Sequence, residues 1–487
     1  MASPRCIRYL ANLSSKPSIS SRWRPALLPS RRVQPHQLTR RPTSSAAAPH
    51  PPQSLSHSLA KAIENTGPIS LIHYMRQCLT GRGGGYYTSS PDQFGPQGDF
   101  VTSPEISQLF GEMLGVWIVY EWLSQGKCNG KKVALVELGP GKGTLMDDVL
   151  RTISKFKDLA ECISGVHLVE ASRPLREVQL SRLCGEESRS HWKEIAPSGS
   201  AKHIGAPVNW YDDVREVPVG SDEVPFFLAH EFFDALPINA FQNTPDGWRE
   251  LLVDVKKSPS NLILTTSEVA SQEPEFCFTV APRQTAPARA LNNLSPRYEA
   301  LSTVPDAVVE MCPDSHGIMI HFCKSIHQAG GGAALIIDYG PAETIPVNSL
   351  RGIQKHTRVS PFTKPGMVDI SADVDFGALV ETALRPEFDI EIHGPTEQAQ
   401  FLLGMGMKER CDQLAATTED PTQLALLKSG FERLTDRGGL GMGRIYKALA
   451  VVPEADGRPV AGFMQPEVTE EAGRAESSVP EAKAEAS

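Results

Sequence analysis

The sequence lacks the features that would place it in several common classes of protein. Its nine cysteines include no C-x-x-C pair, so they have no zinc-binding or thiol-redox spacing and are expected to be reduced thiols. No apolar run approaches the ~20 residues that a membrane-spanning helix needs. The chain also lacks an excess of positive charge. Its formal net charge is -9, whereas a nucleic-acid-binding protein usually carries a basic surface. We therefore expect no bound metal, no membrane span and no nucleic-acid partner, and the sequence gives no indication of an oligomeric state.

Acidic residues are absent from the first 50 positions, which contain eight arginines and many serines. The first acid in the chain is Glu64. A segment that is rich in arginine and serine and free of acids is typical of a mitochondrial transit peptide. The alternative is a disordered basic tail without a targeting function. We predict a transit peptide over residues 1–50 and a location in the mitochondrial matrix.

The remainder of the chain divides by composition into a long domain and a tail. Residues 453–487 are rich in alanine, glutamate and proline, so we predict a disordered acidic tail there. Residues 59–452 read as one α/β domain, with helices at its N-terminal end and an insertion at about 238–316 that helps to bind substrate. Within the insertion, residues 238–255 have the pattern of a hairpin and residues 262–289 the pattern of short strands. The polar segment 341–376 is too long for a plain connection and is expected to be functional.

Strand patterns recur through the domain between helical patterns, as in a mostly parallel sheet with helices on both faces. The helical patterns include 59–80 with a break at Gly67, a helix that begins near Ser103, and residues 317–329. The predicted strands are Val133–Glu137, Val166–Val169, Val208–Asp213, Pro225–Ala229, Ala333–Ile337, Phe388–Ile392 and Arg444–Val452.

A glycine-rich turn follows the first of these strands and is the strongest functional signal. Gly139, Gly141 and Gly143 alternate directly after the strand, and Glu137 stands at the strand's end. Glycine at such positions permits a tight turn and lets the backbone approach a ligand closely. The spacing is G-x-G-x-G rather than the G-x-G-x-x-G of dinucleotide-binding proteins. It is similar to the first motif of class I S-adenosylmethionine-dependent methyltransferases; the alternative is a glycine-rich loop without a ligand.

Further acids end the next strands in the order of the chain. Glu170 ends the second strand, where a carboxylate can accept both hydroxyls of a ribose, although a solvated surface acid is the alternative. Asp212 ends the third strand and is a candidate for the adenine amino group, although an exposed turn aspartate would look the same. Together with the glycine turn, these residues predict an S-adenosylmethionine site.

Acids at the ends of the fourth and fifth strands indicate where the substrate that receives the methyl group binds. Glu231 and Asp234 follow the fourth strand, and ligands of open parallel sheets bind at the carboxyl ends of strands. Two carboxylates there can hold a guanidinium and accept a proton, so we predict that they are catalytic; the alternative is that they cap a turn. Asp338 ends the fifth strand, and we place it in the substrate cleft.

A short polar stretch before the helix that runs to Trp122 is a second candidate for the substrate cleft. Thr102, Ser103 and Glu105 surround a proline that suits the first position of a helix. The functional interpretation is a polar rim over the cofactor. The alternative is an ordinary helix cap.

Taken together, the blocks 98–115, 137–143, 230–237, 335–340, 366–376 and 401–406 resemble the MidA-like methyltransferases. The resemblance implies a class I methyltransferase sheet with an antiparallel last strand and S-adenosyl-L-methionine as cofactor. It carries Glu137, the three glycines and Glu170 over as cofactor positions. For Glu231 and Asp234 it carries over the block rather than an established role.

Mitochondrial members of the resembled family are complex I assembly factors and protein arginine methyltransferases. The resemblance therefore implies symmetric dimethylation of an arginine on a core matrix-arm subunit of complex I, as a requirement for complex I assembly. An assembly chaperone with a vestigial cofactor pocket is the alternative. A nucleotide-dependent oxidoreductase is disfavoured by the glycine spacing.

Overall fold

The computed structural model describes residues 54–81, 83–89, 101–185, 198–256, 274–439, 441–454 and 457–463. The predicted transit peptide lies outside these ranges, as do residues 98–100, 262–273 and 464–487. The helices in this part of the chain are α1 Leu55–Thr66, α2 Leu71–Thr80, α3 Tyr86–Ser89, α4 Ser103–Ile106, α5 Gln108–Ser124, α6 Thr144–Ile153, α7 Lys157–Cys162, α8 Arg173–Cys184, α10 Ala286–Leu294, α11 Pro296–Leu301, α12 Pro313–Ala329, α13 Phe376–Ala383, α14 Gln398–Gly404, α15 Met407–Thr417, α16 Pro421–Thr435 and α17 Met442–Ile445, with 3-10 turns at Gly126–Gly130, Val214–Glu216 and Phe233–Ala235. The strands are β1 Ile69–Ser70, β2 Lys132–Leu138, β3 Ile163–Val169, β4 Ser198–Ser200, β5 Pro207–Tyr211, β6 Glu223–His230, β7 Asn239–Thr244, β8 Gly247–Val255, β9 Phe276–Val280, β10 Val308–Met311, β11 Ala333–Tyr339, β12 Arg351–Gln354, β13 Thr357–Val359, β14 Asp369–Ser371, β15 Ile390–Glu397 and β16 Tyr446–Pro453.

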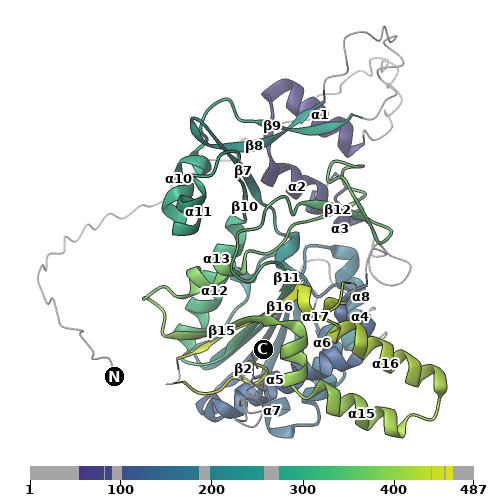
Figure 1. Ribbon diagram of the computed structural model, residues 1–487. Coiled ribbons are helices and arrows are strands. Elements are labelled where there is room, and N and C mark those ends of the chain that lie inside the picture. The colour runs from purple at the N-terminus through teal and green to yellow at the C-terminus, as the bar shows by residue number, and fades with distance from the viewer. Residues whose placement is uncertain are drawn as a thin grey trace, which may run out of the picture. The chain divides into compact units, whose positions relative to one another are not determined.

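The larger sheet has the strand order β15-β16-β11-β6-β2-β3-β5-β4 among the described residues. The five strands from β11 to β5 are mutually parallel, whereas β16, the last strand, runs antiparallel to β11 and to β15 (Figure 1). The predicted fold class is therefore confirmed. Because β2 lies between β6 and β3, the glycine turn after it is at the position where the strand order reverses, and ligands of such sheets bind there.

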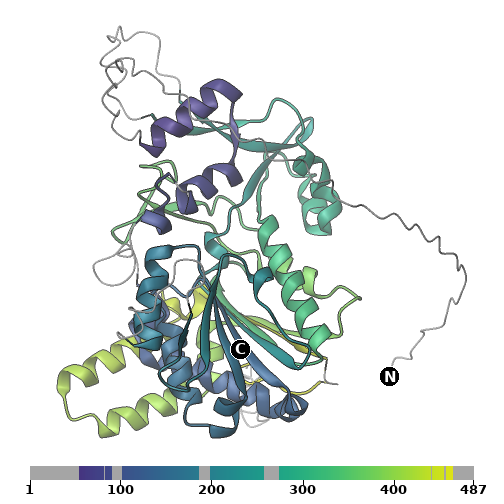
Figure 2. The same ribbon diagram turned by 180° about the vertical axis from the view of Figure 1, so that it is seen from behind.

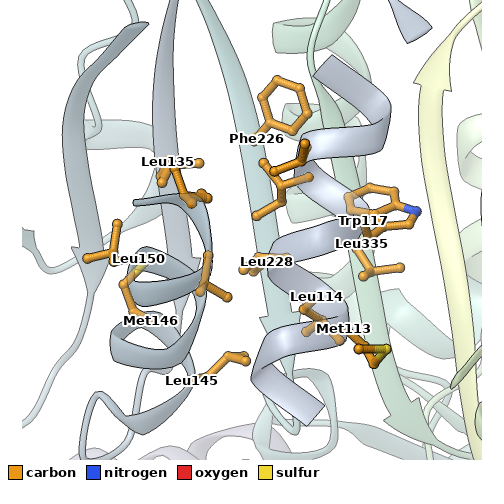
Figure 3. Close-up of a cluster of buried hydrophobic side chains, with 14 of the residues drawn as sticks. Met113, Leu114, Trp117, Leu135, Leu145, Met146, Leu150, Phe226, Leu228 and Leu335 are labelled. Atoms are coloured by element: carbon orange, nitrogen blue, oxygen red, sulfur yellow. The ribbon is translucent and has the colours of Figure 1, made fainter. Parts of the chain in front are cut away.

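Both faces of this sheet are covered by apolar side chains, because alternate residues of a strand point to opposite faces. Leu135 of β2 packs on the face covered by α5 and α6, and Figure 3 shows Trp117 of α5 and Met146 of α6 among the side chains gathered there. Val136 lies on the opposite face, in a cluster that includes Phe322 of α12 and further residues of α13. A strand buried on both faces explains why the sequence of β2 reads as a continuous apolar run.

A smaller antiparallel sheet lies beyond the ends of the parallel strands (Figures 1 and 2). Its order is β1-β8-β7-β10, and β9 also pairs with β8. The pairing of β7 with β8 confirms the predicted hairpin. The prediction of strands through residue 289 is wrong at its end, because residues 286–289 begin α10, which is capped by the side chain of Thr285. The segment 341–376 contains a third sheet, in the order β13-β12-β14.

The two ends of the described chain both contribute to packing. Helices α1 and α2 are separated at Gly67 and Pro68, as predicted, and they pack against β8 and the start of β14. The predicted disordered tail begins too early. Val460 and Ala461 are buried in the core beside the larger sheet, and Arg458 donates to the buried carboxylate of Glu121 at 2.9 Å. The sequence analysis did not recognise that this short apolar stretch of the polar tail packs into the core.

Candidate active site

The glycine turn between β2 and α6 has a backbone that only glycine adopts readily. Gly139, Gly141 and Gly143 have φ values of 63°, 53° and 76°, in the left-handed region. The backbone N–H of Gly139 donates to the carbonyl of Val169 on β3 at 3.0 Å, which ties the turn to the neighbouring strand. A Cβ on Gly139 would lie 2.8 Å from the ring of Phe232. The turn is therefore fixed by sterics as well as by hydrogen bonding.

This turn forms one wall of a cavity of about 970 Å³ at the carboxyl ends of the parallel strands. The same wall includes Gly141, Glu137 and Glu170. The opposite wall comes from the N-terminal helices and from the segment 341–376, which contribute Arg76, Tyr87, Ser349, Arg351, Ile353, His356, Arg358, Asp369, Ser371 and Asp373. Glu231 and Asp234 also line the cavity. The cavity thus lies between the larger sheet, the N-terminal helices, which the sequence analysis left without a role, and the segment 341–376, which it expected to be functional. No described residue of the predicted substrate-binding insertion at 238–316 lines it.

Glu137 and Glu170 are two buried carboxylates beside the glycine turn. Their exposures are only 2% and 7%. Glu170 accepts hydrogen bonds from the backbone N–H of Ser172 at 2.7 Å and from the side-chain amide of Gln179 at 3.1 Å. Burial raises the pKa of Glu137 to about 8, helped by the charge of Glu170, and burial raises the pKa of Glu170 to about 7. Because Oε2 of Glu137 has no hydrogen-bond partner among the described residues, this wall has acceptor capacity for a ligand.

Glu231 stands at a sharp turn directly after β6. Its φ of 49° is unusual for a residue with a side chain, and such outliers are concentrated at functional sites. Its Oε1 accepts from the backbone N–H of Ser103 at 3.4 Å and lies 3.4 Å from Nε2 of His230. Burial lowers the pKa of His230 to about 3, so the imidazole is neutral and this contact is not an ion pair. Burial, followed by the charge of Asp234, raises the pKa of Glu231 to about 8.

Asp338 holds the loop that carries these two acids. Its Oδ2 accepts from the backbone N–H groups of Phe232 at 3.1 Å, Phe233 at 2.9 Å and Asp234 at 3.3 Å. The side chain is fully buried and does not line the cavity. The predicted place of Asp338 in the substrate cleft is therefore wrong. A carboxylate at a strand end can turn toward its own backbone surroundings, and the sequence pattern is the same in either case.

Asp234 belongs to a group of side chains that the sequence analysis did not assemble. The hydroxyl of Tyr339 donates to Oδ2 of Asp234. The guanidinium carbon of Arg351 lies 4.7 Å from the centre of the Tyr339 ring, and Arg351 Nη1 donates to Asp373 at 2.7 Å. Burial raises the pKa of Asp234, while Tyr339 and Arg351 oppose that rise. The unusual length of 341–376 was the signal for Arg351 and Asp373, but it gave no partners.

The remaining predicted residues divide into those that reach the cavity and those that do not. Thr102 and Glu105 line it, and Glu105 Oε2 is buried without a hydrogen-bond partner. Ser103 does not line it but donates to Glu231 through its backbone N–H. The helix-cap alternative does not describe Ser103, because α4 begins with it and Thr102 is the N-cap residue. Gly143 completes the turn without lining the cavity.

Asp212 is the predicted cofactor residue that the structure places elsewhere. Its side chain is 79% exposed, pairs with Arg176 and does not line the cavity. The alternative interpretation, an exposed turn aspartate, describes it better.

Two further searches concern the described residues only. They contain no group of three or more His, Cys, Asp or Glu side chains arranged to hold a metal ion. None of the helices in these ranges is long and apolar enough to cross a membrane.

Comparison with known proteins identifies relatives over most of the chain. A family model of S-adenosyl-L-methionine-dependent methyltransferases matches residues 113–396. The cattle protein named "Protein arginine methyltransferase NDUFAF7, mitochondrial" is 38% identical over 403 residues, which are 82% of this chain and 83% of that protein. The human protein of the same name is 36% identical over 410 residues, covering 83% of this chain and 85% of the relative.

Solved structures have the same fold. A likely methyl transferase from Burkholderia thailandensis, bound to S-adenosyl-homocysteine, matches with a TM-score of 0.60 and 22% identity and covers 84% of this chain and 92% of its own. A native structure from the same organism and superfamily matches with a TM-score of 0.62 and 23% identity, over 84% of this chain and 94% of its own.

Proposed function

This chain belongs to the family of S-adenosyl-L-methionine-dependent methyltransferases, and we propose that it transfers a methyl group to an arginine side chain of a mitochondrial protein. The observation that carries the proposal is the position of Glu231 and Asp234. Both line the same cavity as the glycine turn, and both follow a strand adjacent to the one that carries the turn. Carboxylates are the side chains that a guanidinium binds best.

The cofactor fits the wall formed by β2, β3 and the glycine turn. Gly139 and Gly141 line the cavity with left-handed backbone, and the unpartnered oxygen of Glu137 is an acceptor for an N–H or O–H donor. Glu170 offers carboxylate oxygens to vicinal hydroxyls such as those of a ribose. When bound, S-adenosyl-L-methionine supplies an electrophilic methyl group on a sulfonium.

We call the part of the cavity lined by Glu231, Asp234, Tyr339, Arg351 and Asp373 the acceptor wall. It orients the guanidinium and receives its proton. Asp234, held by Tyr339, accepts an N–H of the guanidinium and fixes its plane. Glu231 has a pKa raised to about 8, and a cationic guanidinium beside it favours its ionised form. Once the guanidinium loses a proton, the Glu231 carboxylate is the group that holds that proton. The neutral His230 beside Glu231 adds no competing positive charge.

The arginine acceptor and the mitochondrial location are supported by the names of the relatives. The resemblance to MidA-like proteins supports the finer proposal, which is symmetric dimethylation of a core matrix-arm subunit of complex I. In mitochondria depleted of this protein, the wild type should restore both the dimethylarginine mark, read by mass spectrometry, and complex I assembly. Restoration of assembly by a variant that binds cofactor without transferring methyl would favour the chaperone alternative.

The central test removes one charge at a time. Asp234→Asn and Glu231→Gln should each lower single-turnover methylation of an arginine-containing peptide by about 10-fold to 100-fold, the equivalent of ~1.5–3 kcal/mol. The affinity for S-adenosyl-L-methionine, measured by calorimetry, should change less than twofold. Wild-type rates per folded molecule in both variants would remove the catalytic role from these acids and leave the methyltransferase assignment intact.

A further inference from the structure

A continuous line of four side chains runs along the acceptor wall from Asp373 to Asp234. Asp373 accepts a hydrogen bond from Arg351, whose guanidinium stacks over the ring of Tyr339, and the Tyr339 hydroxyl donates to Asp234. All four residues line the cavity. Asp234, in the turn after β6, is therefore connected through the ring of Tyr339 to Arg351 on β12 of the third sheet.

The position of Arg351 is fixed by Ser349, which is itself held by the buried acid Glu310. Arg351 Nη1 also donates to the carbonyl of Ser349 at 2.8 Å. Ser349 in turn is held by Glu310 of β10, which accepts from the backbone N–H of Ser349 at 3.0 Å and from its hydroxyl. The Ser349 hydroxyl oxygen accepts from the backbone N–H of Asp373 at 2.8 Å. The side chain of Arg351 is only 15% exposed, so the guanidinium has few other places to go.

The charge of Arg351 acts on Asp234 in a direction that catalysis requires. Burial raises the pKa of Asp234, and the hydrogen bond from Tyr339 and the charge of Arg351 oppose this. A cation over a phenol ring draws electron density from the hydroxyl toward the ring face and so strengthens the hydroxyl as a donor. Removal of the cation should leave Asp234 protonated to higher pH.

Other titratable groups face Asp234 from every neighbouring element. They are Tyr87 of α3, Glu231 after β6, Asp338 and Tyr339 of β11, Arg351 of β12 and Tyr446 of β16. Two of these groups are acids, three are phenols, and Arg351 is the one that is always positive. Within this described set, Arg351 alone supplies a permanent charge that favours ionised Asp234.

We propose that Arg351 is a positioning residue for methyl transfer, which acts through Tyr339 to keep Asp234 ionised and aligned toward the acceptor guanidinium. This proposal rests on the function proposed above, in which Asp234 accepts an N–H of the substrate. Arg351 itself donates to Asp373 and Ser349 through Nη1, and its positive charge would repel a cationic acceptor guanidinium.

A second buried arginine provides a matched control. Arg297 donates to Asp375 at 2.8 Å, and its side chain is 21% exposed, against 2.7 Å and 15% for Arg351 with Asp373. Arg297 also pairs with Glu381 at 2.9 Å, so its removal breaks more ion pairs than the removal of Arg351 and is a stringent control. Arg297 also lies near an aromatic ring, 6.0 Å from the centre of Tyr298. Neither Arg297 nor Asp375 lines the cavity. Loss of a buried ion pair alone is therefore reproduced by Arg297→Met, without a change at Asp234.

The test is the pH profile of single-turnover methylation at saturating S-adenosyl-L-methionine. Arg351→Met should lower the plateau about 10-fold and move the acid limb upward by about one pH unit, since a nearby opposite charge typically shifts a carboxylate by 1–3 units. Arg351→Lys should restore most of the limb position, because it keeps the charge. Arg297→Met should leave the limb unmoved. Tyr339→Phe, which keeps the ring and removes the hydroxyl, should also move the limb upward and provides a second route if Arg351→Met folds poorly.

Three results would overturn the proposal. The first is an unmoved acid limb in both Arg351→Met and Tyr339→Phe. The second is an upward shift in Arg297→Met of the same size, which would make it a general effect of lost buried pairs. The third is a lower KM for peptide in Arg351→Met, which would make Arg351 a competitor of the acceptor arginine. If Asp234→Asn turns over normally, the proposed function of Asp234 fails; if Asp234→Asn is slow while the limb stays unmoved, only the role of Arg351 fails.

Discussion

The cofactor wall and the acceptor wall of the cavity both contain buried carboxylates, but the groups around them differ. Glu170 receives its hydrogen bonds from neutral donors, namely the backbone of Ser172 and the amide of Gln179, and Glu137 keeps an unpartnered oxygen. Asp234 instead accepts from the Tyr339 hydroxyl and has the charge of the cavity-lining Arg351 nearby. The charge of Arg176 also lowers the pKa of Glu170, but it does so less than the hydrogen bonds from Ser172 and Gln179, and Arg176 does not line the cavity. Burial raises the pKa of a carboxyl on both walls.

This difference matches what the proposed function requires each wall to bind. A ligand that brings neutral hydroxyl donors needs acceptors with spare capacity, and the cofactor wall leaves that capacity unfilled. A ligand that brings a full positive charge, and then gives up a proton, needs a carboxylate that is ionised before it arrives. The acceptor wall therefore includes a cation of its own, although its ligand is also a cation. Variants that act on one wall and spare the other test this comparison.

The largest effect is expected in the glycine turn. Gly141 has a φ of 53° and lines the cavity, so Gly141→Val places a branched side chain in ligand space and in a strained backbone conformation. Calorimetry should detect a loss of S-adenosyl-L-methionine affinity of more than about 100-fold, while the thermal melt should show that the fold persists. Gly205→Val, at another left-handed glycine with open space around it, serves as the control for backbone strain. Equal loss of binding in the control would show that backbone strain, rather than a side chain in the cavity, causes the effect.

Isosteric amides on the two walls should give opposite results. Glu170→Gln keeps the shape but loses the charge that strengthens hydrogen bonds from hydroxyls, so cofactor affinity should fall about 10-fold to 100-fold. Turnover at saturating cofactor should change little. Asp234→Asn should do the reverse. Similar losses of both quantities in both variants would show that the walls do not work separately.

The two walls also differ in how far the sequence predicts them. The cofactor wall is local, because Glu137 and the three glycines lie within one short stretch of the chain and Glu170 directly follows the next strand. Apolar runs and glycine spacing are therefore enough to place it. The acceptor wall is assembled from α2, α3, β11, β12 and β14, which are distant in sequence. Which residues belong to the acceptor wall depends on the direction of their side chains, which the sequence does not show. The sequence analysis misplaced Asp338 for that reason, because this side chain points to the backbone of the loop after β6.

A smaller effect, of about tenfold, is expected from pH on cofactor binding. The pKa of Glu170 in the folded protein is raised to about 7, above the ordinary value of 4.5, so the stability from this group is full below about pH 4.5 and is lost as pH rises through 7. Hydroxyl donors favour the ionised form, so S-adenosyl-L-methionine should bind about tenfold more tightly at pH 8 than at pH 6. The thermal shift produced by the cofactor should grow over the same range. Glu170→Gln should flatten both dependences; an equally steep dependence in that variant would assign the proton to Glu137.

The smallest effect is expected at Asp212, which marks the border of the cofactor wall. The strand pattern places this aspartate at the carboxyl end of β5, where an acid can reach an adenine, but its side chain is 79% exposed and pairs with Arg176. Arg176 also donates to the carbonyl of Glu170 at 2.7 Å through Nε, so the arginine stays anchored when the aspartate is neutralised. Exposed ion pairs contribute ~0–1 kcal/mol, so Asp212→Asn should lower stability by no more than that. Its cofactor affinity should stay within about twofold of the wild type, whereas a direct contact with adenine would cost about tenfold through a lost hydrogen bond to a charged group. Calorimetry on Asp212→Asn beside Glu170→Gln therefore decides whether the adenine is recognised by an acid after β5, or whether the charged part of the cofactor wall ends at Glu170.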